Sequence, residues 1–177
     1  ISDLKYWADK ITPEGSFSCK SREADTKYLE LEAFVFYETF TGDRQYRALI
    51  DKIYLKSAAG FAEKYTPTVA LWTERELGIH LGAAVDYFRL TSNENALMRA
   101  GSLVNQWTDM AGRGNGAPQV TYTQHEGGGP GGTTPMTLTN SPWMSAMYFQ
   151  AARRYWQITG DDNVLKQASD YFDWLDE

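Results

Sequence analysis

The sequence is poor in the residues that build metal and disulfide sites. Cys19 is the single cysteine among 177 residues. A lone cysteine excludes a framework of internal disulfide bonds and a metal site made of paired cysteines. The two histidines, His80 and His125, lie far apart in the sequence, at no spacing typical of metal ligands. We therefore expect neither a metal ion nor another cofactor.

Positive charge and long apolar runs are scarce as well. The chain has 17 Lys and Arg against 23 Asp and Glu, which gives a net charge of -6. Binding nucleic acid needs clustered basic residues that neutralise phosphates, and the sequence holds no such cluster. No run of apolar residues reaches the length of a membrane-spanning helix. Nucleic acid and membrane are thus not expected as partners.

The composition is that of an ordinary folded protein with many aromatic residues. Hydrophobic residues make up 42% and aromatic residues 14% of the chain. This content suffices for a core, so we expect one domain over residues 1–177. The chain starts at Ile1 and has no signal-like segment there, which indicates a processed product or a piece of something longer.

An internal repeat is the strongest pattern. The segments "FYETFTGDRQYRALI", "DYFRLTSNENALMRA" and "RYWQITGDDNVLKQA" align at offsets of 50 and then 68 residues. Alanine, tyrosine and threonine positions coincide in this register: Ala33, Ala83 and Ala151; Tyr37, Tyr87 and Tyr155; Thr41, Thr91 and Thr159. Recurrence of this kind is typical of repeat architectures.

Each repeat predicts a helix, a tight turn and a second helix. Gly42 and Gly160 are typical of a helix end where the chain turns left-handed. The next position holds Asp43, Asn93 or Asp161, residue types that favour the N-cap of the following helix. Segments such as "LEAFVFYETF" are apolar nearly all round, which predicts an inner helix, whereas the second helix is amphipathic and therefore outer. The start, "ISDLKYWADK", is predicted to be the remnant of another outer helix.

The connections between hairpins are long and should emerge at one end of the array. They cover about residues 11–24, 65–73 and 113–141. The third contains "VTYTQ" and "TTPMTLT", which alternate with β-favouring residues and predict a small β-hairpin acting as a flap. Long loops on a helical scaffold usually carry binding and chemistry. We therefore expect the working face at this end.

Candidate residues for chemistry gather near these loops. Cleaving a glycosidic bond requires two carboxyl groups, and the acidic residues available are Glu23, Asp25, Glu74, Glu76 and Glu126. Acidic residues also belong in the first turn of any helix, where they offset its dipole. His80 shares its repeat position with Glu30 and Tyr148. These three either converge on a proton-transfer site or are hydrogen-bonded groups of the core.

Two further sets complete the candidate site. His125 and Tyr122 in the predicted flap could serve as base and acid in the β-elimination of an acidic sugar, although His125 could equally be an ordinary exposed side chain. A substrate-binding surface is expected from Trp72, Arg75, Trp143, Arg22 and Asn140. Flat aromatic faces stack on sugar rings, and polar groups orient them.

The repeat resembles the six-hairpin (α/α) toroid enzymes that act on carbohydrates. The resemblance is carried by "NSPWMSAMYFQAARRYWQITGDDNVLKQASDYFDWL" and by "WTERELGIHLGAAVDYFRLTSNENALMRAGSLVNQW". It implies an all-α fold of consecutive antiparallel hairpins, with the substrate cleft at the loop end of the inner helices. It also slightly favours a secreted or periplasmic location. It transfers no catalytic residue. A complete ring needs more helices than this chain supplies, so a second copy or further hairpins would have to close it.

Three functions follow from these patterns. The leading interpretation is a carbohydrate-active protein, similar to glycoside hydrolases, that binds an oligo- or polysaccharide at the loop face. The first alternative is a polysaccharide lyase that uses Tyr122 and His125. The second is a non-catalytic helical scaffold for a protein partner, since repeat arrays offer extended binding surfaces. The sequence leans toward an enzyme without deciding the question.

Overall fold

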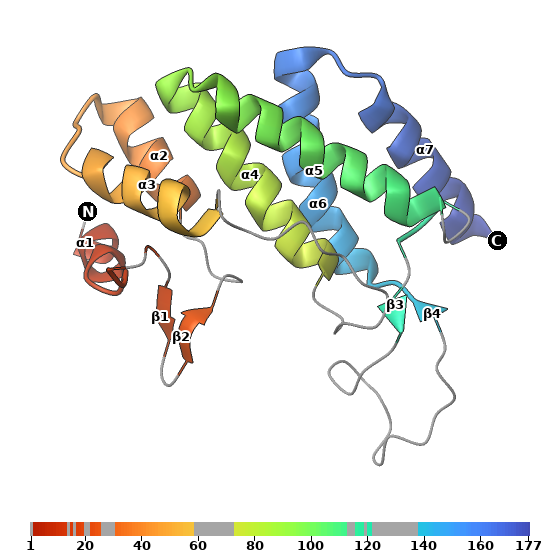
Figure 1. Cartoon of the computed structure of the whole chain (residues 1–177), viewed down its shortest axis with the longest axis horizontal. Coiled ribbons are helices and arrows are strands. Elements are labelled where there is room, and N and C mark those ends of the chain that lie inside the picture. The colour runs from red at the N-terminus through yellow and green to blue at the C-terminus, as the bar shows by residue number, and fades with distance from the viewer. Residues whose placement is uncertain are drawn as a thin grey trace. The chain divides into compact units, whose positions relative to one another are not determined.

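The computed structural model describes residues 2–13, 15, 17–19, 22–25, 31–58, 73–112, 116–118, 120–121 and 138–177. This part of the chain is mostly helical, as predicted, and Figure 1 labels its elements. The α-helices are α1 (Ser2–Ala8), α2 (Leu31–Thr41), α3 (Arg47–Ile53), α4 (Thr73–Thr91), α5 (Glu94–Gly112), α6 (Pro142–Thr159) and α7 (Asn163–Asp176). A π-helical turn, Tyr54–Ala58, follows α3.

Short strands occupy two of the predicted connections. β1 (Phe17–Cys19) pairs antiparallel with β2 (Arg22–Asp25). β3 (Val120–Thr121) pairs antiparallel with β4 (Leu138–Thr139), at the two ends of the segment for which a β-hairpin is predicted. The sequence predicts only a connection between hairpins where β1 and β2 lie.

The chain forms two compact units. Unit 1 comprises Ile1–Ala62 and Ile79–Ala100, and unit 2 comprises Glu63–Gly78 and Gly101–Glu177. The helices α4 and α5 each contribute residues to both units, because the division falls within them.

In unit 1, α2 packs against α3 (Figure 1). The core comes from side chains spaced three and four residues apart on these helices and from the later part of α4. Its fully buried members are Phe34, Ile50, Ile53, Leu81, Ala84 and Val85. Tyr54 stacks on Tyr87 with ring centroids 4.1 Å apart, so an aromatic pair joins the π-helical turn to α4. Such a pair stabilises by about 1 kcal/mol beyond its buried area.

The prediction that the first helix of each pair is buried on both sides is wrong for α2. Phe36 is 44% exposed and Phe40 is 83% exposed. These two rings contact one another, with centroids 6.1 Å apart. Only the face of α2 that bears Leu31, Phe34 and Val35 is buried. An apolar composition therefore did not imply a helix covered on every side.

In unit 2, α6 packs against α7 (Figure 1), and Trp107 of α5 lies at the centre of the core. The indole stacks on the ring of Tyr148, with centroids 4.0 Å apart. Gly78 of α4 lies against the backbone of α6. A Cβ at this glycine would meet the backbone N of Tyr148 at 2.7 Å, a distance that real Cβ atoms do not show. The absent side chain lets these two helix backbones approach closely.

The three bends between paired helices share one hydrogen-bond pattern. At each bend a threonine hydroxyl donates to the carbonyl four residues earlier and accepts the N–H two residues later. The residues are Tyr37 and Asp43 around Thr41, Tyr87 and Asn93 around Thr91, and Tyr155 and Asp161 around Thr159. The repeated threonine thus makes the same two hydrogen bonds at each bend.

The residue after each threonine adopts a left-handed backbone. Gly42 and Gly160 do so with φ of 71° and 67°, as the sequence predicts. Ser92 stands at the same repeat position and also has a positive φ, 57°. A side chain there costs about 1 kcal/mol or more, since Cβ crowds the following carbonyl. The hydrogen bonds around Thr91 hold Ser92 in this conformation.

The predicted N-caps are right at one bend and wrong at two. Asn93 caps α5, because its Oδ1 accepts the N–H of Ala96 at 3.2 Å. Asp43 and Asp161 instead accept the N–H two residues on, while Tyr46 and Asp162 hold the N-cap positions of α3 and α7. Aspartate side chains also accept hydrogen bonds within turns of this kind, and Asp43 and Asp161 form this turn contact instead of a helix cap.

Candidate functional site

The structure places the predicted site residues in four groups. Unit 2 holds Glu74, Arg75, Glu76, Asn140 and Trp143. His80 is buried in unit 1. Arg22 lies in β2, and its side chain is outside the description. Four predicted residues fall outside the described part of the chain: Trp72, Tyr122, His125 and Glu126. The candidate site is therefore built from the residues of unit 2.

Glu74 is a buried carboxyl group in the first turn of α4. Its side chain is 1% exposed. The Nδ2 of Asn140 donates a hydrogen bond of 3.1 Å to Glu74 Oε1. Among the described residues, no donor meets hydrogen-bond geometry at the other oxygen, Oε2. A buried polar atom without a partner is uncommon in folded proteins and requires an explanation.

The environment of Glu74 favours its protonated form. Burial raises the pKa of this carboxyl group from 4.5 to about 7. The backbone N–H groups of Glu74 itself and of Ser141 act in the opposite direction, because they favour the carboxylate. Burial outweighs them. Near neutral pH, Glu74 therefore exists as a mixture of acid and carboxylate, the state that suits a group that donates and accepts protons.

Asn140 joins four segments of unit 2. It lies between β4 and α6 and is half-buried. Besides its bond to Glu74, its Nδ2 donates to Pro118 O at 2.7 Å. Its Oδ1 accepts two hydroxyl groups, from Ser145 at 3.1 Å and from Tyr171 at 2.8 Å. All four contacts lie within hydrogen-bond range, so the amide has little freedom to rotate.

Ser145, Tyr171 and Pro118 belong to this cluster, and the sequence analysis did not predict them as site residues. Tyr171 occupies a position that holds Ile53 and Leu103 in the other repeats, which predicts a packing residue on the apolar face of α7. A tyrosine at an otherwise aliphatic position of the repeat was the available signal. Burial raises the pKa of the Tyr171 hydroxyl, and the charge of Glu74 raises it further.

A second polar group lies deeper in unit 2. The hydroxyl of Tyr148 donates to Gln167 Oε1 at 2.7 Å. The amide nitrogen of Gln167 donates to Val104 O at 2.9 Å and to Thr108 Oγ1 at 2.7 Å. This group satisfies the buried polar atom of Tyr148, one of the three residues for which a converging site was considered. Glu30, the third of that set with His80, lies outside the described residues.

An exposed aromatic side chain contacts Arg75, the residue that follows Glu74 in α4. Trp143, in the first turn of α6, is 45% exposed. The guanidinium carbon of Arg75 lies 5.7 Å from the centroid of its ring, a cation–π contact. Glu76 is half-exposed in the first turn of α4. Three predicted residues thus border solvent beside the buried carboxyl group.

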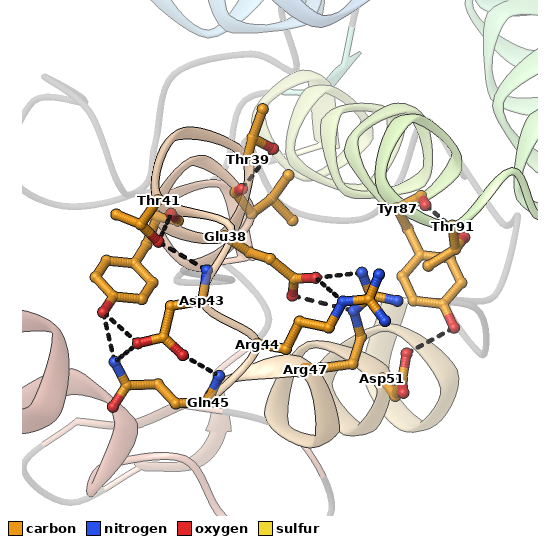
Figure 2. A network of polar contacts seen from close by, with 12 residues as sticks. Glu38, Thr39, Thr41, Asp43, Arg44, Gln45, Arg47, Asp51, Tyr87 and Thr91 are labelled. Carbon is orange, nitrogen blue, oxygen red and sulfur yellow. Dashed lines mark hydrogen bonds and ion pairs between the residues drawn. The ribbon is translucent and has the colours of Figure 1, made fainter.

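A second buried carboxylate lies in unit 1, among different partners. Glu38 is 5% exposed, and Arg47 donates to both of its oxygens. Arg44 adds a second guanidinium at 3.7 Å from Oε1 (Figure 2). The hydrogen bond to Glu38 raises the pKa of Arg47, and burial partly opposes this effect. This arrangement is a paired charge that holds α2 to α3.

The described part of the chain holds no group of three His, Cys, Asp or Glu side chains that could bind a metal ion. Nor does any helix within it have the length and apolar character needed to cross a membrane. Comparison of the chain with protein-family models, with curated proteins and with solved structures finds no match.

Proposed function

We propose that this chain is a carbohydrate-active protein of the (α/α) toroid type that cleaves glycosidic bonds. In this proposal Glu74 is the proton donor, and the surface formed by Arg75, Glu76 and Trp143 binds the sugar. The observation that carries the proposal is the buried carboxyl group of Glu74, whose pKa is raised to about 7. It lies next in sequence to Arg75, which contacts the exposed Trp143.

The chemistry of Glu74 fits the acid step of glycoside hydrolysis. The general acid of such enzymes has a raised pKa, so that it still carries a proton near neutral pH. The proton moves from Glu74 to the glycosidic oxygen while the bond from that oxygen to the sugar carbon breaks. The bonding electron pair stays with the departing oxygen. Water supplies the hydroxyl group that the sugar carbon gains, and its other proton passes to the second carboxylate. For the second role we propose Glu76, a half-buried carboxyl group two residues further along α4.

The binding surface has the composition expected for sugars. The ring of Trp143 offers an apolar face of the kind that stacks on pyranose rings. Arg75 lies over the same side chain and supplies hydrogen-bond donors for hydroxyl or carboxylate groups. Both residues belong to first helical turns, where the sequence analysis expected the working face.

The ring architecture is part of the proposal. The three equivalent threonine bends support consecutive helical hairpins, as in (α/α) toroids. A ring would need either further hairpins or a second copy of the chain. Measuring the mass of the protein in solution with and without an oligosaccharide tests whether copies associate.

Turnover of a glycan panel tests the activity, with reducing ends as the readout. We expect Glu74→Gln to lower turnover by about 10²- to 10⁴-fold, the usual contribution of a general acid. Glu94→Gln is the matched control, since Glu94 is an exposed acidic residue in the first turn of α5. It should leave turnover unchanged. Equal rates for both variants on a cleaved glycan would remove Glu74 from the mechanism.

Tryptophan fluorescence tests the binding surface separately. Oligosaccharides should change the emission of the protein, and Trp143→Ala should abolish most of that change. Trp156→Ala is the control, because Trp156 lies near the other end of α6. If Trp156→Ala removes the response and Trp143→Ala does not, sugar binds elsewhere.

A non-catalytic scaffold is the second candidate, and one observation favours it. Glu74 is 1% exposed, and a substrate must reach it. For a scaffold, replacing both Glu74 and Glu76 by Gln leaves partner binding intact and no glycan is cleaved.

The lyase alternative depends on Tyr122 and His125, which lie outside the described residues. It predicts an unsaturated, ultraviolet-absorbing product that Glu74→Gln does not affect.

A further inference from the structure

The orientation of the Asn140 amide is determined by its partners. Pro118 O can only accept a hydrogen bond, so the atom that faces it at 2.7 Å must be the Asn140 nitrogen. The oxygen of the amide then faces Ser145 Oγ and Tyr171 OH, both of which can donate. With one N–H on Pro118, the other N–H of the amide points to Glu74 Oε1.

We propose that Asn140 is a positioning residue for Glu74: its amide holds Oε1 and leaves Oε2 as the oxygen that gains and loses the proton. The inference rests on the proposed function, in which Glu74 transfers a proton. During that step the proton leaves Oε2, and the carboxylate that results keeps its hydrogen bond from Asn140. The amide itself neither gains nor loses a proton.

The connections of Asn140 explain how one side chain can fix the carboxyl group. Ser145 is fully buried on α6, Tyr171 is 3% exposed on α7, and Pro118 is buried in the turn after α5. Three segments therefore clamp the amide plane, and the amide in turn clamps Glu74. A carboxyl group held at one oxygen cannot exchange its two oxygens by rotation without breaking that bond.

Among the described residues, few charged groups lie where they could affect the protonation of Glu74. From α7, the titratable group that acts on it is the Tyr171 hydroxyl, which is neutral below its raised pKa. From its own helix, the adjacent charges are Arg75 and Glu76. The residues of α6 and of the turn after α5 that contact Asn140 are Ser145 and Pro118, which do not titrate. Besides burial and the backbone N–H groups of Glu74 and Ser141, the group that contacts this carboxyl group is the Asn140 amide, which donates to Oε1.

The sign of the expected effect follows from the hydrogen bond. An N–H donor favours the carboxylate and so lowers the pKa of Glu74 relative to burial alone. Asn140→Ala removes this donor, so the pKa of Glu74 should rise further above 7, by about one unit. Asn140→Asp keeps the shape and adds a like charge, which should raise the pKa more. Ser145→Ala is the matched control, because it removes a partner of Oδ1 and leaves the donor in place.

The test is a carboxyl ¹³C NMR titration of Glu74 in the full chain and in these variants. A rise with Asn140→Ala and Asn140→Asp, and a smaller change with Ser145→Ala, supports the positioning role. An unchanged pKa in a folded Asn140→Ala or Asn140→Asp protein overturns it. Where a glycan is cleaved, the alkaline limb of the pH–rate profile should move to higher pH by the same amount.

This measurement separates the two proposals. A shifted pKa without turnover on any glycan refutes the glycosidase and leaves the role of Asn140 standing. Turnover that depends on Glu74, combined with an unmoved pKa and pH profile in the Asn140 variants, refutes the positioning role alone. Asn140→Asp turns an acceptor oxygen toward Pro118 O, so Asn140→Ala is the deciding variant, and circular dichroism checks that it is folded.

Discussion

The two units each bury a glutamate, and the partners of these glutamates differ. Glu38 in unit 1 lies against the guanidinium groups of Arg47 and Arg44. Glu74 in unit 2 lies against the neutral amide of Asn140, and burial raises its pKa to about 7. Two carboxyl groups that are both buried thus have partners of different charge.

This contrast separates two uses of the same side chain. A buried carboxylate that is paired with a guanidinium is held by charge-assisted hydrogen bonds. Beside a neutral amide, the unfavourable burial of a carboxylate charge is not offset. Such a carboxyl group binds and releases its proton near neutral pH. Only the second kind resembles the acids of glycoside hydrolysis.

The largest expected effect is on the pH dependence of unit 2. The pKa of Glu74 is higher in the folded chain than the ordinary value of 4.5. The folded state therefore holds its proton while the unfolded state loses it, and stability falls as the pH rises from about 4.5 to about 7. The full cost above that range is about 3 kcal/mol, from a shift of roughly two and a half units.

Glu74→Gln removes the ionisation and with it this cost. We expect the variant to be more stable than the native protein at pH 8, by up to about 3 kcal/mol, and similar to it at pH 4. Denaturant unfolding at both pH values, followed by tryptophan fluorescence, checks the prediction. A variant that is less stable at pH 8 would show that Glu74 is held as a satisfied carboxylate, like Glu38.

The opposite behaviour is expected for the pair in unit 1. Arg47→Met removes the main partner of Glu38 and leaves the exposed Arg44 to compensate in part. We expect a loss of about 2 kcal/mol, because a buried carboxylate remains with a weaker partner. Amide hydrogen exchange of α2 and α3 measures this loss in unit 1 directly. Unchanged protection would mean that Glu38 needs no cation.

Two tyrosines extend the comparison to hydroxyl groups. Tyr87 in unit 1 donates to the carboxylate of Asp51 at 2.9 Å, and burial followed by this hydrogen bond raises its pKa to about 12. Tyr171 in unit 2 donates to a neutral amide oxygen at 2.8 Å. A bond to a charged acceptor is the stronger, so Tyr87→Phe should cost about 2 kcal/mol and Tyr171→Phe about 1 kcal/mol. Equal losses in thermal unfolding would contradict this ranking.

How much the sequence could predict depended on the range of the interactions. The threonine bends, the left-handed glycines and the helical character were predictable, because each is decided within a few residues. Glu74, Asn140 and Trp143 were predicted as site residues from their places at helix starts. Their geometry was not predictable, since Asn140 meets Glu74 across 66 positions of sequence.

Most of the incorrect predictions have the same origin, because they too depend on interactions beyond the local sequence. Tyr171 was assigned to packing because its apolar ring follows the periodicity of α7, and nothing local shows where its hydroxyl points. Phe36 and Phe40 were expected to be buried because α2 is apolar all round, yet burial depends on what packs against each face. Asp43 and Asp161 were expected to cap helices, and two local hydrogen-bond patterns of similar energy competed there.

The bends supply the baseline for the comparison, because the same structure recurs in both units. Ser92 has a φ of 57° where Gly42 and Gly160 stand in the other repeats. Ser92→Gly relieves the crowding of Cβ but adds backbone freedom to the unfolded chain, so the net gain in stability should be small, about 0.5 kcal/mol.

Gly42→Ala and Gly160→Ala should each lower stability by about 1 kcal/mol. No neighbouring atom lies within 4 Å of the added Cβ, so the left-handed backbone alone opposes these substitutions. Thermal unfolding of the three variants measures these differences. Equal losses for Gly42→Ala in unit 1 and Gly160→Ala in unit 2 would show that the bends are energetically equivalent. The difference between Glu38 and Glu74 would then come from their partners and not from the hairpins that carry them.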